Sequence, residues 1–317
     1  MPEQVILTDR TETSRERPWR EKRMKSELLA AVYDEINRSK AVRLRDCGTV
    51  LTFNVDTEGK KRLAEANFCH VRLCPMCSWR RSLAVYSAVR KVVDAMSGKY
   101  AFMFLTLTVR NIPGSELSGE IDHLMDSWQR LTQRKAWRQA VKGWYRGLEV
   151  THNVSRLSSS FDTFHPHFHC LLAVEPLYFK SRQYINQARW VELWRNALKV
   201  EYAPVVDVRR VSGNTGKDVA EAAKYAVKDG EMIDPEDWDL TLETVRVLDC
   251  ALHKRRLVAY GGAMKEWHKR LNLPDEEATD LVHIDGEQDS SETVRVEVYA
   301  WHTGYQQYIL RDEILSK

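Results

Sequence analysis

The sequence predicts an α+β fold in which helices pack on an antiparallel sheet. Between residues 102 and 228 the helix and strand patterns follow one another as strand, helix, two strands, helix, strand and helix. The two consecutive strands are joined by the Ser-rich loop SRLSSS, which suits an antiparallel pair. Apolar residues make up 43% of the 317 residues, enough for helices to cover one sheet and form a packed core.

The N-terminal elements follow from local composition and spacing. Residues 1–24 are polar and carry mixed charges, which indicates a flexible arm. Apolar residues at helical spacing come next, with Ser26 as a suitable N-cap, and Gly98 ends a later helical pattern. The expected elements are a helix at 26–37, a strand at 50–55 and a helix at 78–96.

Alternating aromatic, branched and threonine residues in FMFLTLTV mark the first strand of the next region, at 102–109. A turn at 111–114 follows. The remaining expected elements are a helix at 116–141, strands at 145–152 and 167–174, a helix at 181–199, a strand at 205–211 and a helix at 217–228. After residue 230 we expect further helices, then a hairpin at 294–310 that turns at Thr303 and Gly304.

Composition argues against a membrane or secreted protein. The mean hydropathy is −0.48. The longest apolar stretch, AFMFLTLTV, is far shorter than the roughly 20 residues that cross a bilayer. The first ten residues contain acidic groups and lack the apolar core of a signal peptide. We therefore expect a cytoplasmic protein.

The net charge is only +3, so the distribution of charge says more about nucleic acid than its sum does. Three stretches are basic: Arg72, Arg80, Arg81, Arg90 and Lys91; Arg15, Arg17, Arg20, Lys22, Arg23 and Lys25; and Lys254, Arg255 and Arg256. Any one of them can be an ordinary solvated surface. Contact with phosphate gains weight where such a stretch lies beside a metal or catalytic site.

Three histidines stand close together in HPHFHCLL. Alternate residues of a strand share a face, so His167 and His169 should project together while Phe168 points into the core. Pro166 leaves the direction of His165 open. Glu149, between apolar neighbours on the adjoining predicted strand, is a suitable third ligand for a divalent cation. The alternative is a polar surface strand without metal.

The helix DVAEAAKYAVKDG carries a second group of candidates. Its apolar stripe contains Val219, Ala222, Ala223, Ala226 and Val227. Glu221, Tyr225 and Lys228 fall on the opposite side, where a tyrosine that only fills the core would not lie. An exposed surface tyrosine is the alternative interpretation.

The order FLTLT, HPHFH and EAAKYAVK resembles the three motifs of HUH endonucleases, named for the pattern His-hydrophobic-His. The chain looks most like replication initiators of rolling-circle plasmids, in the class with one catalytic tyrosine and a glutamate one helical turn before it. The resemblance covers residues 47 to 228. It implies metal ligands at His167 and His169, a nucleophile at Tyr225 and water activation by Glu221. Families differ at the third ligand, here Glu149.

The implied activity is sequence-specific nicking of DNA at a plasmid origin, single-stranded or extruded at the nick site. A divalent ion, Mn²⁺ or Mg²⁺, would polarise the scissile phosphate, and Lys228 would add positive charge there. Attack by Tyr225 would give a 5′-phosphotyrosine and a free 3′-OH for a polymerase. A host helicase and polymerase are therefore expected partners. The origin sequence and the oligomeric state, a homodimer included, are left open.

Four of the six cysteines form a cluster, with Cys47 followed by Cys69, Cys74 and Cys77. This spacing is typical of a structural zinc site, with His70 as a reserve ligand. A Cys-Pro-x-Cys redox pair and buried unliganded thiols are the alternatives. The helix that follows is basic, so the zinc site is expected to brace an element that contacts DNA.

Four segments are expected: an arm at 1–24, a zinc-binding element with a basic helix at 25–98, a nicking domain at 99–230, and helices with a hairpin of unknown role at 231–317. Two other functions compete with the initiator. One is a relaxase or tyrosine transposase of the same superfamily, and the other is a zinc-containing DNA-binding regulator without catalysis. The aligned Glu221, Tyr225 and Lys228 favour an enzyme, because a pure binding protein has no need of them.

Overall fold

The computed structural model describes residues 4–11, 15–211, 215–223, 227–234, 236–284 and 292–315. The chain forms two compact units. Unit 1 contains residues 1–84 and 280–317, and unit 2 contains residues 85–279. The predicted segment 231–317 is therefore divided between the two units. In the part of the chain that the structure describes, every helix is too short or too polar to span a bilayer.

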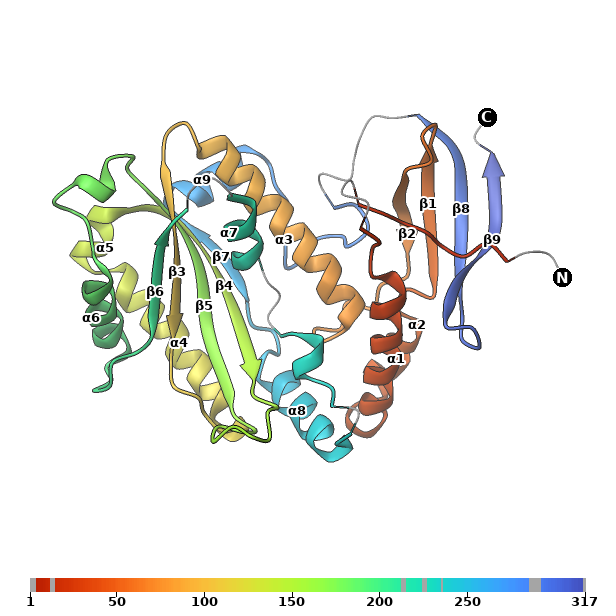
Figure 1. Cartoon of the computed structure of the whole chain (residues 1–317), viewed down its shortest axis with the longest axis horizontal. Helices are drawn as coiled ribbons and strands as arrows, with labels where there is room; N and C mark the ends of the chain where they lie inside the picture. Colours follow the sequence, from red (N-terminus) through yellow and green to blue (C-terminus); the bar gives the residue numbers. More distant parts are fainter. Residues whose placement is uncertain are drawn as a thin grey trace. The chain divides into compact units, whose positions relative to one another are not determined.

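Unit 1 is built on a four-stranded antiparallel sheet in the order β2-β1-β8-β9 (Figure 1). Its strands are β1 (Val50–Asp56), β2 (Lys61–Ala66), β8 (Thr293–His302) and β9 (Gln307–Leu315). The hairpin predicted at 294–310 is confirmed, and its partner is β1 from the other end of the chain. Alternate residues of β1 are buried, among them Phe53, whose ring packs edge-on against Trp19.

Two helices complete unit 1: α1 (Trp19–Ile36) and α2 (Arg38–Asp46). Helix α1 begins seven residues before the predicted Ser26, because Trp19 is buried and its indole donates to the buried Asp9 at 2.7 Å. Ahead of it, Ile6 forms a β-bridge with Ile309. The flexible arm predicted at 1–24 is therefore not observed among the described residues, because these contacts hold them in place.

Unit 2 holds a five-stranded sheet in the order β6-β3-β5-β4-β7, and every pair in it is antiparallel. The strands are β3 (Ala101–Thr108), β4 (Val141–His152), β5 (Phe164–Val174), β6 (Val206–Arg210) and β7 (Val258–Gly261). The predicted α+β class is confirmed. The one long helix expected at 116–141 is instead two, separated at Gln133 and Arg134, and the chain then enters β4 at Val141, which pairs with Val174.

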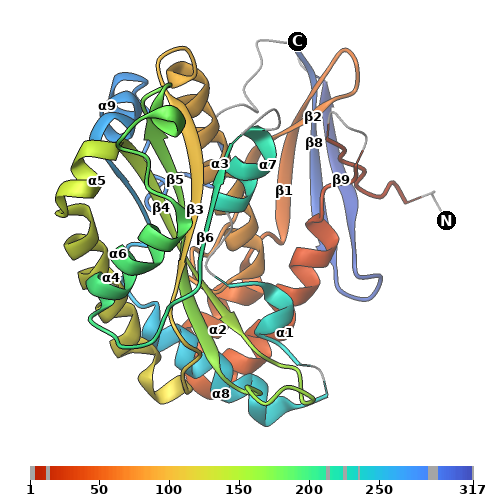
Figure 2. The ribbon, with the colours of Figure 1, turned by 60° about the vertical axis from the view of Figure 1, so that its left-hand side comes forward.

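Helices cover both faces of this sheet (Figure 2). One face packs against α4 (Leu117–Thr132), α5 (Lys135–Ala140) and α6 (Gln187–Leu198), through edge-to-face contacts of Trp128 with Trp137 and Phe168. The other face packs against the unit 2 part of α3 (Pro75–Met96), α7 (Thr215–Ala222) and α9 (Gly262–Arg270). Helix α8 (Trp238–Ala251) packs on α4.

Candidate functional site

Three polar side chains of unit 2 meet on the sheet face that α7 covers. His167 and His169 lie two residues apart on β5, and Glu149 of β4 is the register partner of His167. Phe168, between the histidines, points to the opposite face and contacts Trp128. The alternation predicted from the sequence is therefore present, and all three polar side chains are buried.

The three side chains converge on one point. The Nε2 atoms of His167 and His169 are 3.1 Å apart, and Glu149 Oε2 lies 2.8 Å from His169 Nε2 and 3.5 Å from His167 Nε2. His167 Nδ1 is 2.9 Å from the carbonyl of His165, to which it can donate, and His169 Nδ1 is 3.3 Å from Thr106 Oγ1. Partners at Nδ1 fix the imidazole rings and leave both Nε2 atoms available. Two imidazoles and a carboxylate so placed fit a divalent cation.

The carboxylate of this group is charged although it is buried. Burial opposes ionisation, but the hydrogen bonds from His167 and His169 outweigh it and hold the pKa of Glu149 well below its usual range. The ammonium of Lys228 adds positive charge, with Nζ 3.6 Å from Glu149 Oε1. The Glu149 carboxylate is thus buried and negatively charged, with histidine and lysine donors around it. A cation bound at this point would balance that charge.

Helix α7 brings one further candidate to the site. Glu221 Oε1 lies 4.0 Å from His169 Nε2, and this side chain is one-third exposed. The apolar stripe predicted for the helix is buried as expected at Val219, Ala222 and Ala223. Tyr225 and Ala226 lie outside the described residues.

The predicted helix at 217–228 extends too far at its C-terminal end. Helix α7 ends at Ala222, and Lys228 is not helical. Lys228 instead begins a 3₁₀ turn, η3 (Asp229–Glu231), in which the Glu231 N–H donates to its carbonyl at 3.0 Å. Lys228 Nζ also pairs with Glu231 Oε1 at 2.9 Å. Lys228 therefore reaches Glu149 from this turn and not from the helix.

Sequence reasoning missed two residues beside the site, Glu231 and His152. Glu231 Oε2 accepts the backbone N–H of His152 at 3.3 Å, and His152 Nδ1 lies 3.1 Å from the Glu231 carbonyl. The buried His152 ring stacks on Phe164 and pairs with Asp162 at 2.9 Å. The only signal in the sequence was a histidine three residues after Glu149. Nothing local connects it to Glu231.

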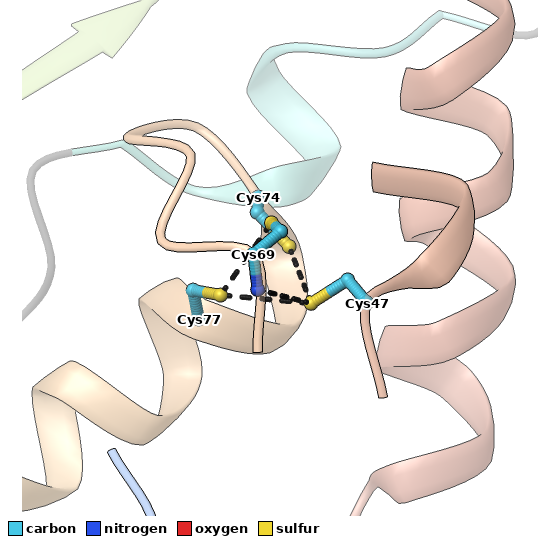
Figure 3. A group of neighbouring side chains, drawn as sticks. All are labelled: Cys47, Cys69, Cys74 and Cys77. Carbon is cyan, nitrogen blue, oxygen red and sulfur yellow. Dashed lines mark hydrogen bonds between the residues drawn. The ribbon is translucent and has the colours of Figure 1, made fainter. Parts of the chain in front are cut away.

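A second cluster lies in unit 1, where the four cysteines predicted to bind metal point toward one another (Figure 3). Their Sγ atoms are separated by 3.5 Å (Cys47 and Cys74), 3.6 Å (Cys47 and Cys77) and 3.7 Å (Cys69 and Cys77). Four sulfurs at the corners of a tetrahedron lie about 3.8 Å apart when the metal–sulfur bonds are about 2.3 Å. All four are free, buried thiols, so the geometry fits a metal centre and not a disulfide.

The surroundings of this cluster settle two smaller expectations. His70, the reserve ligand, is exposed and lies outside the group of four. Arg80 and Arg81, expected on a DNA-contacting helix, are buried. Arg80 donates to the carbonyls of Leu281 and Val282 at 2.8 and 3.0 Å, which removes it from the surface. The expectation of DNA contact is therefore wrong for these two arginines.

Comparison with known proteins gives one family. The pattern of the Rep_1 family, replication proteins, matches residues 60–309. A "Protein rep" of Bacillus amyloliquefaciens is 40% identical, covering 96% of this chain and 97% of its own. A "Protein rep" of Bacillus sp is 42% identical over 77% of this chain and 85% of its own. A third, of Streptococcus pneumoniae serotype 2, is 35% identical over 97% and 96%. No solved structure is significantly similar.

Proposed function

This chain belongs to the Rep_1 family of replication proteins, and we propose that it initiates and terminates rolling-circle replication of a plasmid as a metal-dependent DNA nickase and strand transferase. The observation that carries the proposal is the convergence of Glu149, His167 and His169 on one point under α7. Three protein ligands leave coordination positions open for a phosphate oxygen. Glu221 and Lys228, both expected from the sequence, approach the same group.

A divalent ion held by these three residues, Mn²⁺ or Mg²⁺, would polarise the scissile phosphate and orient it. Residues of the chain carry out the bond-making and charge-stabilising steps. The Tyr225 oxygen attacks the phosphorus and forms a phosphotyrosine with the 5′ end, while the bond to the 3′ oxygen breaks. Tyr225 gives up its hydroxyl proton and the 3′ oxygen takes up one, so the step is balanced. Lys228 places positive charge near the phosphate oxygens. The free 3′-OH then serves a host polymerase.

The second cleavage of a replication round needs water in place of a tyrosine. Glu221 is suited to accept the proton of that water, because a carboxylate is a competent general base. We assign structural Zn²⁺ to the thiols of Cys47, Cys69, Cys74 and Cys77. The proposed DNA substrate is a plasmid origin, single-stranded or extruded at the nick site, that a host helicase then unwinds.

Two alternatives are separable from this proposal. A relaxase or transposase of the same superfamily would use the same site on a different DNA, and a zinc-containing regulator would bind DNA without cutting it. The length match to the "Protein rep" relatives favours the initiator. The Glu149, His167 and His169 group favours an enzyme, because a binding protein does not need a second, mixed metal site.

The deciding experiment uses a labelled single-stranded origin oligonucleotide with Mn²⁺. We expect a covalent protein–DNA adduct that survives denaturation. Tyr225→Phe should abolish both nicking and the adduct while DNA binding is kept. Tyr184→Phe and Tyr202→Phe are the matched controls and should behave like wild type. An adduct formed at the normal level by Tyr225→Phe would contradict the assignment, and loss in a control would point to that residue.

A further inference from the structure

Several of the basic residues noted in the sequence already have partners within the protein. Beyond the buried Arg80, Arg23 is buried and donates to the carbonyls of Leu44 and Arg45 at 3.2 and 2.7 Å. Arg256 pairs with both carboxylate oxygens of Asp275 at 2.9 Å. Other basic residues of the surface are therefore also candidates for contact with phosphate.

Helix α2 of unit 1 was not among those stretches, yet it carries four basic residues in nine and one acid, Asp46. It buries only Ala41 and Leu44, against α1. Arg38, Arg43 and Arg45 are exposed, and Lys40 is partly exposed. Between them Val42 keeps 52% of its surface accessible.

Both ends of α2 are fixed. The Asn37 side chain accepts the Lys40 N–H at 3.1 Å, which caps the N-terminus. The buried Arg23 satisfies two carbonyls of the last turn, and Cys47 of the four-cysteine cluster follows the helix directly. Arg43 donates to the carbonyl of Cys69, another member of that cluster. A metal at the cluster would therefore hold α2 rigid, and a rigid surface loses little conformational entropy on binding.

The neighbouring acids offset part of the charge of the helix, but not all of it. Asp34 of α1 pairs with Arg45, and Glu35 and Asp46 are the other nearby carboxylates in sequence. The Cys69 carbonyl that Arg43 contacts is neutral, so that guanidinium keeps its full charge. Lys40 lies over the Tyr33 ring, with Nζ 5.6 Å from its centroid.

We propose that α2 is a contact surface for double-stranded DNA flanking the nick site, an inference that rests on the proposed function. Nine helical residues extend about 14 Å, a length over which a duplex presents about eight phosphates. A single strand is the poorer fit, because single-strand sites stack bases on aromatic side chains and α2 contains none. A helix fits the major groove, where an apolar group such as Val42 can contact a thymine methyl.

The test compares duplex binding with single-strand nicking. Arg38→Glu is the first variant, because an acid in the first turn suits the helix dipole and should leave α2 folded. We expect duplex origin binding at 150 mM salt to weaken about 10-fold, and the slope of log affinity against log salt to fall by about 1. Arg43→Gln should give a smaller loss in the same direction. Arg311→Glu, an exposed arginine of β9, is the control and should bind like wild type.

Adduct formation on a short single-stranded oligonucleotide separates this inference from the proposed function. It should be normal in Arg38→Glu, and the content of bound metal should be unchanged. Wild-type duplex binding by both Arg38→Glu and Arg43→Gln would overturn the inference, as would an equal loss on single-stranded DNA. If wild-type protein forms no adduct, the proposed function fails, while duplex binding still decides the role of α2.

Discussion

Unit 1 surrounds one point with four thiols, whereas unit 2 surrounds one point with two imidazoles and a carboxylate. Thiolates are soft ligands, and four of them fill the tetrahedral shell of zinc and leave no place for a substrate. Imidazole with carboxylate suits harder divalent ions, and three ligands leave positions open. By number and softness of ligands, the first site suits a structural ion and the second suits an ion with open coordination positions.

The groups that lie beside the ligands also differ between the two sites. The thiols receive backbone N–H groups, from Cys69 to Cys47 and from Val71 to Cys69, both at 3.4 Å. Such groups stabilise sulfur and can do no chemistry. The site of unit 2 has Glu221 and Lys228 beside it, one carboxylate and one ammonium that are both partly exposed. Of the two sites, the second is the one with a carboxylate and an ammonium beside its ligands.

The largest expected effect comes from removing metal from unit 2. EDTA should abolish nicking quickly, and Mn²⁺ or Mg²⁺ should restore it, while zinc bound to the four thiols stays in place. His169→Ala should lower the rate of adduct formation about 10²–10³-fold, because loss of one positioned electrostatic donor typically costs that much. Full activity in metal-free protein would remove the distinction between the two sites.

Loss of Glu221 should have the next largest effect, on one step only. Glu221→Ala should form the first 5′ adduct at a normal rate, because Tyr225 and not water is the nucleophile there. The second cleavage should slow by roughly 10²–10⁴-fold, the usual worth of a general base. A replication assay should then accumulate multimeric single strands, with Glu236→Ala, an exposed glutamate, as the control. Unit-length products at wild-type levels would leave Glu221 without a catalytic role.

Cys74→Ser tests the other member of the pair. Structural zinc contributes directly to folding, so the variant should lose the tightly bound ion. We expect the melting temperature to fall by about 5–10 °C, which corresponds to a loss of a few kcal/mol for a protein of this size. Cys250→Ser, at an exposed cysteine outside the cluster, should leave both zinc and melting temperature unchanged. Unchanged zinc content in Cys74→Ser would contradict the assignment.

Local patterns predicted much of this molecule, and contacts between distant residues account for the rest. The two-residue period of a strand was enough to place His167 and His169 on one face, and adjacent strands brought Glu149 to them. The burial of Arg80 could not be predicted, because its partners are the carbonyls of Leu281 and Val282, far along the chain. A run of basic residues in a sequence does not show whether their side chains are exposed to solvent or donate hydrogen bonds to the carbonyls of a distant loop.

The early end of the helix that precedes Tyr225 has a similar cause. The pattern of small apolar residues continues to Val227, so spacing alone predicted a helix through Lys228. In the structure Lys228 is tied instead to Glu231, which is tied in turn to His152 at the end of β4. The position of the ammonium is therefore set by the sheet, through contacts that no helical period encodes.

Glu231→Gln should give the smallest effect, and it tests whether unit 2 positions its charges as strictly as unit 1 positions its thiols. Gln keeps an oxygen that can accept from His152, but it removes the anion that pairs with Lys228 at 2.9 Å. Because Lys228 is half exposed, this pair contributes little to stability, about 0–1 kcal/mol. The effect of Glu231→Gln should instead be that the Lys228 ammonium is less well positioned.

We therefore expect the single-turnover rate of adduct formation by Glu231→Gln to fall about 10-fold, equivalent to about 1.4 kcal/mol in the barrier. Oligonucleotide affinity and melting temperature should stay near wild type. Lys228→Ala should lower the rate at least as far, and the double variant should be no slower than Lys228→Ala alone, since Glu231 acts through the lysine. Glu236→Gln is the matched control. Additive losses in the double variant would mean that Glu231 acts on the site by another route, and an unchanged rate in Glu231→Gln would mean that Lys228 needs no partner to find the phosphate.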